Sequence, residues 1–178
     1  MDSGTIFLVG MMGAGKTTIG RALAHRLGRP FVDTDRVLVE RCGVPVATIF
    51  EIEGEAGFRR RESSVLAEVA AEGGRVVATG GGAVLDPRNR EVMRQNGTVI
   101  YLRARLESLW ERTRHDTSRP LLATPNPKAR LAELLEQRDA LYREAAHLVV
   151  DTGSQSAATL IGRIVTVLEA HAAEHGAR

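Results

Sequence analysis

Short apolar runs alternate with longer amphipathic stretches along this chain. Such runs, bounded by polar or turn residues, are typical of buried strands. Five of them predict strands, at residues 5–9, 31–32, 75–78, 98–102 and 148–150. Apolar positions at helical spacing predict helices at residues 17–27, 55–71, 128–144 and 157–171. The alternation predicts an α/β fold in three layers, with helices on both faces of a five-stranded parallel sheet.

Composition narrows the class of protein. A length of 178 residues, with 43% hydrophobic and 26% charged residues, is ordinary for one soluble domain. The 24 basic residues exceed the 22 acidic ones by two, and aromatic residues make up only 4%, so a nucleic-acid partner is not expected. The single cysteine, Cys42, fits a reducing compartment. Because no apolar run reaches the length of a membrane span, we expect a cytoplasmic protein without a membrane partner.

A glycine-rich segment follows the first predicted strand and opens the first predicted helix. Residues 10–17 read Gly-Met-Met-Gly-Ala-Gly-Lys-Thr and match the pattern G-x-x-x-x-G-K-[ST] in full. Glycines let several backbone N–H groups converge on a triphosphate, and the start of the helix adds partial positive charge. Lys16 is suited to the β- and γ-phosphates and the Thr17 hydroxyl to Mg²⁺. The predicted ATP contacts in this P-loop are those of Gly13, Ala14, Gly15, Lys16, Thr17 and Thr18.

The remaining motifs bear on the fate of the nucleotide. The sequence has no N-K-x-D signature for guanine, which disfavours a GTPase. The strand at 75–78 leads into three glycines, residues 80–82, and not into the usual metal-binding aspartate. Asp33, at the end of the second predicted strand, is therefore the candidate carboxylate for the metal. With Asp35 it lies where open α/β folds bind ligands, although the pair also fits a helix N-cap with an acidic first turn.

Several further side chains are candidates for binding an acceptor. Arg59 and Glu62 are three residues apart on a predicted helix and can pair, whereas Arg60 and Arg61 are expected on a solvated face. The three glycines suit a main chain that contacts a ligand, with a flexible turn as the alternative. Arg138 alone would be a surface helix residue. The proline-containing stretch 115–127 is long for a compact domain and is either functional or disordered.

Together these motifs resemble the shikimate kinase family, in the same order and at similar intervals. The resemblance covers about residues 5–170 and is carried by the P-loop, Asp33-Thr34-Asp35, Phe58-Arg59 with Glu62, Gly80–Gly82, Arg119-Pro120-Leu121, and Arg138 with Leu141-Tyr142. It implies a P-loop NTPase fold like that of nucleoside-monophosphate kinases, in a single domain over 1–178. It also implies a mobile lid at about 112–126 and an acceptor-binding region at about 33–62. The implied activity is the ATP-dependent phosphorylation of the 3-hydroxyl of shikimate, in aromatic amino-acid biosynthesis.

The resemblance also implies roles for particular residues. It makes Arg59 and Arg138 a clamp for the shikimate carboxylate, and Asp35 the residue that binds ring hydroxyls and is the candidate to take a proton. Gly80, Gly81 and Gly82 would offer main-chain contacts, and Phe50 and Phe58 apolar walls. Lys16, Asp35 and Arg119 are the implied catalytic residues, with Arg119 swinging from the lid over the phosphates and Mg²⁺ held near Thr17 and Asp33. On the ATP side, Arg112 matches an adenine-stacking position, and Gln155 stands where the family often has a basic residue. A monomer is expected.

Other functions share parts of this pattern. A kinase acting on gluconate or on a nucleotide would have the same P-loop, although paired arginines suit one carboxylate and no separate base-binding segment is apparent. A nucleotide-binding module without catalysis is opposed by the intact set of Lys16, Thr17, Asp33, Asp35 and Arg119. Residues 171–175 spell H-x-x-E-H, a zinc-protease pattern. Because this pattern lies close to the end of the chain, we expect it to be part of a solvated helix tail.

Overall fold

The computed structural model describes residues 4–176 and contains one parallel sheet. Its strands are β1 (Thr5–Val9), β2 (Phe31–Asp33), β3 (Val76–Ala78), β4 (Gly97–Arg103) and β5 (Leu148–Asp151), in the order β2-β3-β1-β4-β5. All five predicted strands are present, with small differences at their ends. The three central strands are buried on both faces, which explains their continuous apolar runs.

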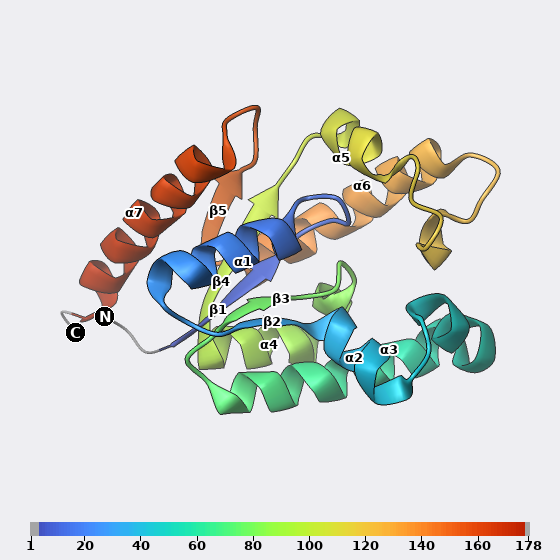
Figure 1. Ribbon diagram of the computed structural model, residues 1–178, viewed down its shortest axis with the longest axis horizontal. Helices are drawn as coiled ribbons and strands as arrows, with labels where there is room; N and C mark the ends of the chain where they lie inside the picture. The colour runs from blue at the N-terminus through green and yellow to red at the C-terminus, as the bar shows by residue number, and fades with distance from the viewer. Residues whose placement is uncertain (1–3, 177–178) are drawn as a thin grey trace.

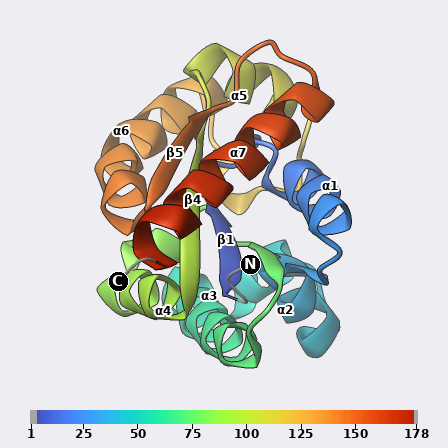
Figure 2. The ribbon, with the colours of Figure 1, turned by 90° about the vertical axis from the view of Figure 1, so that its left-hand side faces the viewer.

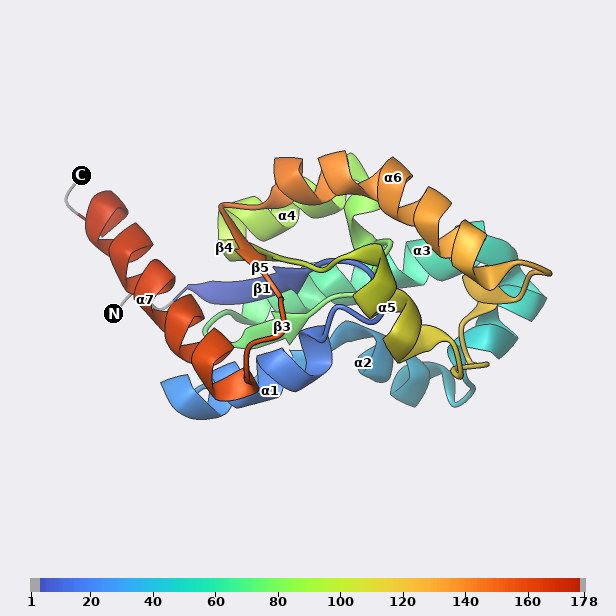
Figure 3. The same cartoon turned by 90° about the horizontal axis from the view of Figure 1, so that it is seen from above.

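Helices cover both faces of this sheet, so the predicted fold class is confirmed. They are α1 (Lys16–Leu27), α2 (Thr34–Cys42), α3 (Val46–Glu72), α4 (Pro87–Asn96), α5 (Leu106–Thr113), α6 (Pro127–Ala145) and α7 (Ala157–Gly176), with short 3-10 turns η1 (Ala83–Leu85) and η2 (Pro120–Leu122). Figures 2 and 3 show α1 and α7 on one side of the sheet and α4 and α6 on the other. None of the helices in residues 4–176 combines the length and apolarity that crossing a bilayer requires.

Three helices and part of a fourth were not predicted. Helices α2, α4 and α5 are short and bury few side chains; α4, for example, buries only Asn89 and Met93. Helix α3 begins at Val46, nine residues before the predicted start at Glu55, and is kinked at Gly54, where φ is 69°. The kink interrupts the helical periodicity, which is why the sequence pattern revealed only the part after it.

Three of the segments that leave the sheet at its carboxyl edge carry residues predicted for the site. The P-loop joins β1 to α1, Asp33 ends β2, and the glycines at 80–82 follow β3. Since the strands are parallel, their carboxyl ends lie together. Figure 1 shows the segment between α5 and α6 on this side of the molecule, facing α2 and α3.

Candidate active site

The P-loop adopts the tight backbone that its glycines suggested. Gly13 and Gly15 have φ values of 80° and 92°, in the region that favours glycine. A Cβ at Gly13 would also lie only 2.8 Å from the Cγ2 of Thr113 in α5. Helix α1 begins at Lys16, directly after the loop, so its N-terminus points at the space where phosphates would bind.

Lys16 lies across this loop. Its Nζ donates hydrogen bonds to the carbonyl oxygens of Gly10 (2.6 Å) and Met11 (2.9 Å). Burial of the ammonium group lowers the pKa of Lys16 from 10.5 to about 8, while the nearby Asp35 carboxylate acts in the opposite direction. An anionic ligand beside this group would therefore favour its charged form.

The side chains of Thr17, in the first turn of α1, and Asp33, at the end of β2, are hydrogen-bonded to each other. The Thr17 hydroxyl donates to Asp33 Oδ2 at 2.7 Å, while Asp33 Oδ1 accepts from the backbone N–H groups of Asp35 and Arg36. Asp33 is thus the N-cap of α2, which was one interpretation of the sequence. It also lies beside Thr17, as its interpretation as a carboxylate near the metal requires. A hydroxyl and a carboxylate side by side suit Mg²⁺, which keeps water ligands and takes the rest from one or two carboxylates and phosphates. Among the side chains that the structure describes, residues 4–174, no group of three or more His, Cys, Asp or Glu could hold a metal alone.

Replacing Asp33 with alanine tests whether the capping residue also serves a metal. Loss of an N-cap aspartate costs about 1 kcal/mol, which lowers the melting temperature of a chain this size by about 2–4 °C. Asp86 is the matched control, because it caps α4 by accepting from the N–H of Arg88. We expect both variants to lose similar stability, but only Asp33→Ala to need about 10-fold more Mg²⁺ for half-maximal turnover. Equal Mg²⁺ dependence in the two variants would show that Asp33 is only a cap.

A cavity of about 460 Å³ opens beside the P-loop. We call it the acceptor cavity; its polar lining comes from Asp35, Arg59, Glu62, Arg119, Arg138 and the glycines at 80–82, and its apolar lining includes Phe50 and Phe58, whose ring centroids are 4.7 Å apart. The structure therefore brings together every residue that the sequence assigned to the acceptor.

The three glycines, residues 80–82, form a turn against which the charged side chains pack. A Cβ at Gly82 would overlap the guanidinium of Arg59, and one at Gly81 would lie 3.6 Å from Nη1 of Arg138. A Cβ at Gly80 would overlap Oε2 of Glu62. None of the three has a positive φ. Close approach of the Glu62 and Arg59 side chains therefore favours glycine at Gly80 and Gly82, whereas a Cβ at Gly81 would make ordinary contacts.

Arg59 and Arg138 reach the cavity from different helices. Arg59, on α3, donates from Nη1 to Glu62 Oε1 (2.9 Å) and from Nη2 to Glu55 Oε1 (3.2 Å). Arg138, on α6, is only 3% exposed. By its helical setting alone Arg138 would be a surface residue, and that interpretation is wrong. Both guanidinium groups face the same glycine turn, one at Gly81 and the other at Gly82.

Besides Arg119 Nε, whose contact with Asp116 is an ion pair, four buried polar atoms around the cavity have no hydrogen-bond partner within the part of the chain that the structure describes. They are Asp35 Oδ1, Arg59 Nε, Glu62 Oε2 and Arg138 Nη1. Burial raises the pKa of Asp35, and the charge of Asp33 adds to this effect; burial also raises the pKa of Glu62, against the pull of Arg59. Buried polar atoms in native proteins are rarely left unsatisfied. A ligand with both hydroxyls and a negative charge would complement this set.

The predicted lid, residues 112–126, lies over the same cavity. Its Ser118, Arg119 and Leu121 contribute to the lining. Nε of Arg119 lies 2.8 Å from Asp116 Oδ2, and the other oxygen of Asp116 accepts from the N–H of Ser118 at 2.9 Å. Movement of the lid stays a prediction.

The side chains of the residues predicted to contact adenine form hydrogen bonds to backbone carbonyl oxygens. Arg112 Nη1 donates to the carbonyl oxygen of Gly13 at 2.9 Å, so this side chain lies against the P-loop. Gln155 is in the connection between β5 and α7, where its amide donates to the carbonyl oxygen of Asp151. Thr18 is exposed in the first turn of α1. The roles of Arg112 and Gln155 towards the base of ATP, and of Thr18 as an ATP contact of the P-loop, stay predictions.

Some residues of the site were missed by sequence reasoning. The segment Val44-Pro45-Val46 between α2 and α3 lines the cavity, and nothing in its composition separates it from ordinary core. Asp116 had a usable signal, because it stands three residues before Arg119. Tyr142 was noted only as part of a motif.

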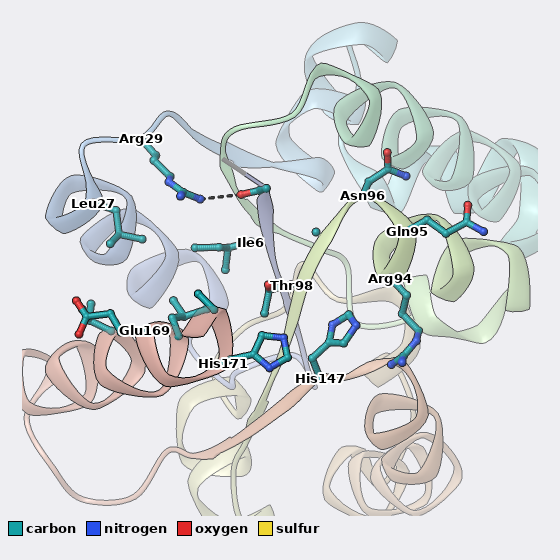
Figure 4. A pocket seen from close by; sticks show the side chains of 15 residues that line it. Ile6, Leu27, Arg29, Arg94, Gln95, Asn96, Thr98, His147, Glu169 and His171 are labelled. Carbon is teal, nitrogen blue, oxygen red and sulfur yellow. Dashed lines mark hydrogen bonds between the residues drawn. The ribbon is translucent and has the colours of Figure 1, made fainter. Parts of the chain in front are cut away.

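A second pocket, of about 1050 Å³, lies at the opposite edge of the sheet (Figure 4). Its lining includes Arg29, which donates to the carbonyl oxygen of Gly4, and Arg94, which donates to three carbonyl oxygens at the end of α6. His171, the first histidine of the H-x-x-E-H pattern, also lines it, with its ring centroid 5.6 Å from that of His147. The side chain of His175, the last residue of that pattern, lies outside the described residues.

The strand order, the P-loop and the adjoining acceptor cavity define a P-loop kinase for a small molecule. A family profile described as shikimate kinase matches residues 12–169. The chain is 60% identical over 154 residues to a shikimate kinase of Nitrosospira multiformis, covering 86% of this chain and 79% of the relative. It is 56% identical over 169 residues to a shikimate kinase of Ralstonia nicotianae, covering 95% and 89%. The chain belongs to the shikimate kinase family.

Solved structures agree with this assignment. The shikimate kinase of Acinetobacter baumannii in complex with shikimate matches with a TM-score of 0.92 and 45% identity, covering 94% of each chain. A gluconokinase from Sinorhizobium meliloti 1021 matches with a TM-score of 0.55 and 19% identity, covering 95% of this chain and 97% of that one. At such identity the second match shows a shared fold alone.

Proposed function

We propose that this chain transfers the γ-phosphoryl group of ATP to the 3-hydroxyl of shikimate, giving shikimate 3-phosphate and ADP. The reaction belongs to aromatic amino-acid biosynthesis. Membership of the shikimate kinase family supports it, and so does the Acinetobacter baumannii relative, whose structure holds shikimate.

The observation that carries the proposal is the set of unsatisfied polar atoms beside the P-loop. Two guanidinium nitrogens, from Arg59 and Arg138, complement a carboxylate, which guanidinium groups bind with two parallel hydrogen bonds. The free oxygen of Asp35 complements a hydroxyl. Shikimate carries a carboxylate and three hydroxyls on one small ring, so it supplies both kinds of partner within a cavity of about 460 Å³.

The proposed mechanism is mainly one of positioning and charge neutralisation. The transition state of phosphoryl transfer is loose and anionic, so a strong base is not required. Lys16 and the backbone of the P-loop hold the phosphates, and Arg119 adds positive charge from the lid. Asp35 orients the attacking hydroxyl and, with its pKa raised by burial, can take its proton. The lid excludes water, which would otherwise compete for the phosphoryl group.

We also propose that Mg²⁺ accompanies ATP, held near Thr17 and Asp33. These two side chains offer the oxygen ligands that Mg²⁺ prefers. When bound, the ion neutralises charge on the β- and γ-phosphates.

The protein is proposed to act as a cytoplasmic monomer without nucleic-acid or membrane partners. The residues that line the acceptor cavity within this one chain include all those proposed to bind the acceptor, which supports the monomer.

A coupled assay of ADP release tests the proposed function. Shikimate, gluconate and nucleoside monophosphates should be compared as acceptors, each with and without Mg²⁺. We expect turnover that requires both Mg²⁺ and shikimate. Turnover that is independent of shikimate, or that is faster with gluconate or a nucleotide, would overturn the proposal. The absence of turnover with every acceptor would favour a nucleotide-binding module.

A further inference from the structure

Tyr142 is a fully buried residue of α6 that does not line the acceptor cavity. It stands one helical turn after Arg138, and its exposed fraction is 0%. Its ring stacks on that of Tyr101 from β4, with centroids 4.9 Å apart and ring planes at 29°. A buried tyrosine hydroxyl usually has a hydrogen-bond partner, and the identity of that partner indicates the role of the hydroxyl.

The Tyr142 hydroxyl joins two parts of the site. It donates a short hydrogen bond, 2.6 Å, to the carbonyl oxygen of Gly81, the centre of the glycine turn. The hydroxyl oxygen of Tyr142 also lies 3.5 Å from the sulfur of Met11 in the P-loop. Burial raises the pKa of Tyr142 to about 12, so the hydroxyl keeps its proton and remains a donor. The charge of the Arg138 guanidinium opposes that rise in pKa.

The position of the Gly81 carbonyl matters to the acceptor site. Because the peptide group is planar and trans, fixing this carbonyl also fixes the direction of the Gly82 N–H. The same turn packs against both guanidinium groups of the clamp, at Gly81 and Gly82. Three glycines in a row restrain their own backbone weakly, so an external hydrogen bond has a large share in defining the turn.

We propose that Tyr142 is a positioning residue: its hydroxyl holds the glycine turn in register with Arg138 and the P-loop, and acceptor binding depends on it. The inference rests on the proposed function, because it assumes an acceptor in the cavity. Tyr142 itself does not contact the acceptor. It acts through the Gly81 carbonyl.

The test compares Tyr142→Phe with Tyr101→Phe. Each variant removes one hydroxyl from the same stacked pair of rings. The Tyr101 hydroxyl donates instead to Asp139 Oδ1 at 2.8 Å. Steady-state kinetics should give KM for shikimate and for ATP, and calorimetry the Kd for shikimate. Thermal melting monitors the fold of both variants.

We expect Tyr142→Phe to raise the KM and Kd for shikimate by about 3- to 10-fold, the effect of one neutral hydrogen bond. The KM for ATP should stay within about twofold, and Tyr101→Phe should leave all three values unchanged. Unchanged shikimate binding in Tyr142→Phe, or an equal loss in Tyr101→Phe, would overturn the proposal. If the wild type uses another acceptor, the proposed function fails, and the same comparison with that acceptor still tests Tyr142.

Discussion

Replacing Arg119 with alanine is expected to lower kcat by about 10³-fold, the lower end of the effect of an arginine finger. Arg119 lines the acceptor cavity from the lid, and its Nε lies 2.8 Å from Asp116 Oδ2. Its charge is needed most when negative charge spreads over the transferred phosphoryl group. Truncation should therefore change kcat far more than the KM for shikimate. Single-turnover measurements with saturating ATP and shikimate check whether the chemical step itself is slowed.

Arg114→Ala is the control for the Arg119 variant. Arg114 belongs to the same segment and pairs with Glu111, but its side chain is 45% exposed and it does not line the cavity. We expect this variant to keep nearly full turnover. Arg119→Lys should recover part of the loss, because it restores the charge without the planar fork. A kcat for Arg119→Ala within tenfold of the wild type would remove Arg119 from the mechanism.

Replacing Arg138 with alanine is expected to weaken the use of shikimate by roughly 1.5–3 kcal/mol, or about 10- to 150-fold in KM. Such a loss corresponds to one hydrogen bond between charged groups. The methyl ester of shikimate, which lacks the negative charge, makes the test specific. For the wild type the ester should bind much more weakly than shikimate, whereas for Arg138→Ala the two should differ much less.

Together the two proteins and two ligands form a double-mutant cycle that isolates the interaction between Arg138 and the carboxylate. Arg130→Ala serves as the control on the same helix, since Arg130 pairs with Glu133 at the surface. Equal discrimination between acid and ester in the wild type and in Arg138→Ala would mean that the clamp is misplaced, even if the variant were less active. Thermal melting shows whether loss of a buried side chain has also affected the fold.

Prediction from the sequence was strongest where local patterning and local chemistry coincide. The five strands followed from their apolar runs, because a parallel sheet covered on both faces leaves no polar face to interrupt them. It was weakest for α4 and α5, which bury few residues and so carry little periodic signal. The kink at Gly54 had a similar effect on α3.

Some residues of the candidate site could likewise be predicted from the local sequence, whereas others could not. The P-loop could be recognised from eight consecutive residues, since the chemistry it performs is local to one turn of backbone. For Asp33 the sequence left a cap and a metal neighbour as alternatives, and the structure shows a cap that also contacts Thr17.

By itself, the sequence determined the α/β class, the nucleotide loop and, through the resemblance, the set of residues around the acceptor. Only the tertiary structure decided that Arg138 is buried, that close packing favours glycine at Gly80 and Gly82, and that the hydroxyl of Tyr142 donates to the carbonyl oxygen of Gly81. The physical reason is distance along the chain. Gly81 and Tyr142 are 61 residues apart, and no local pattern encodes a hydrogen bond formed only when α6 packs beside the carboxyl end of β3.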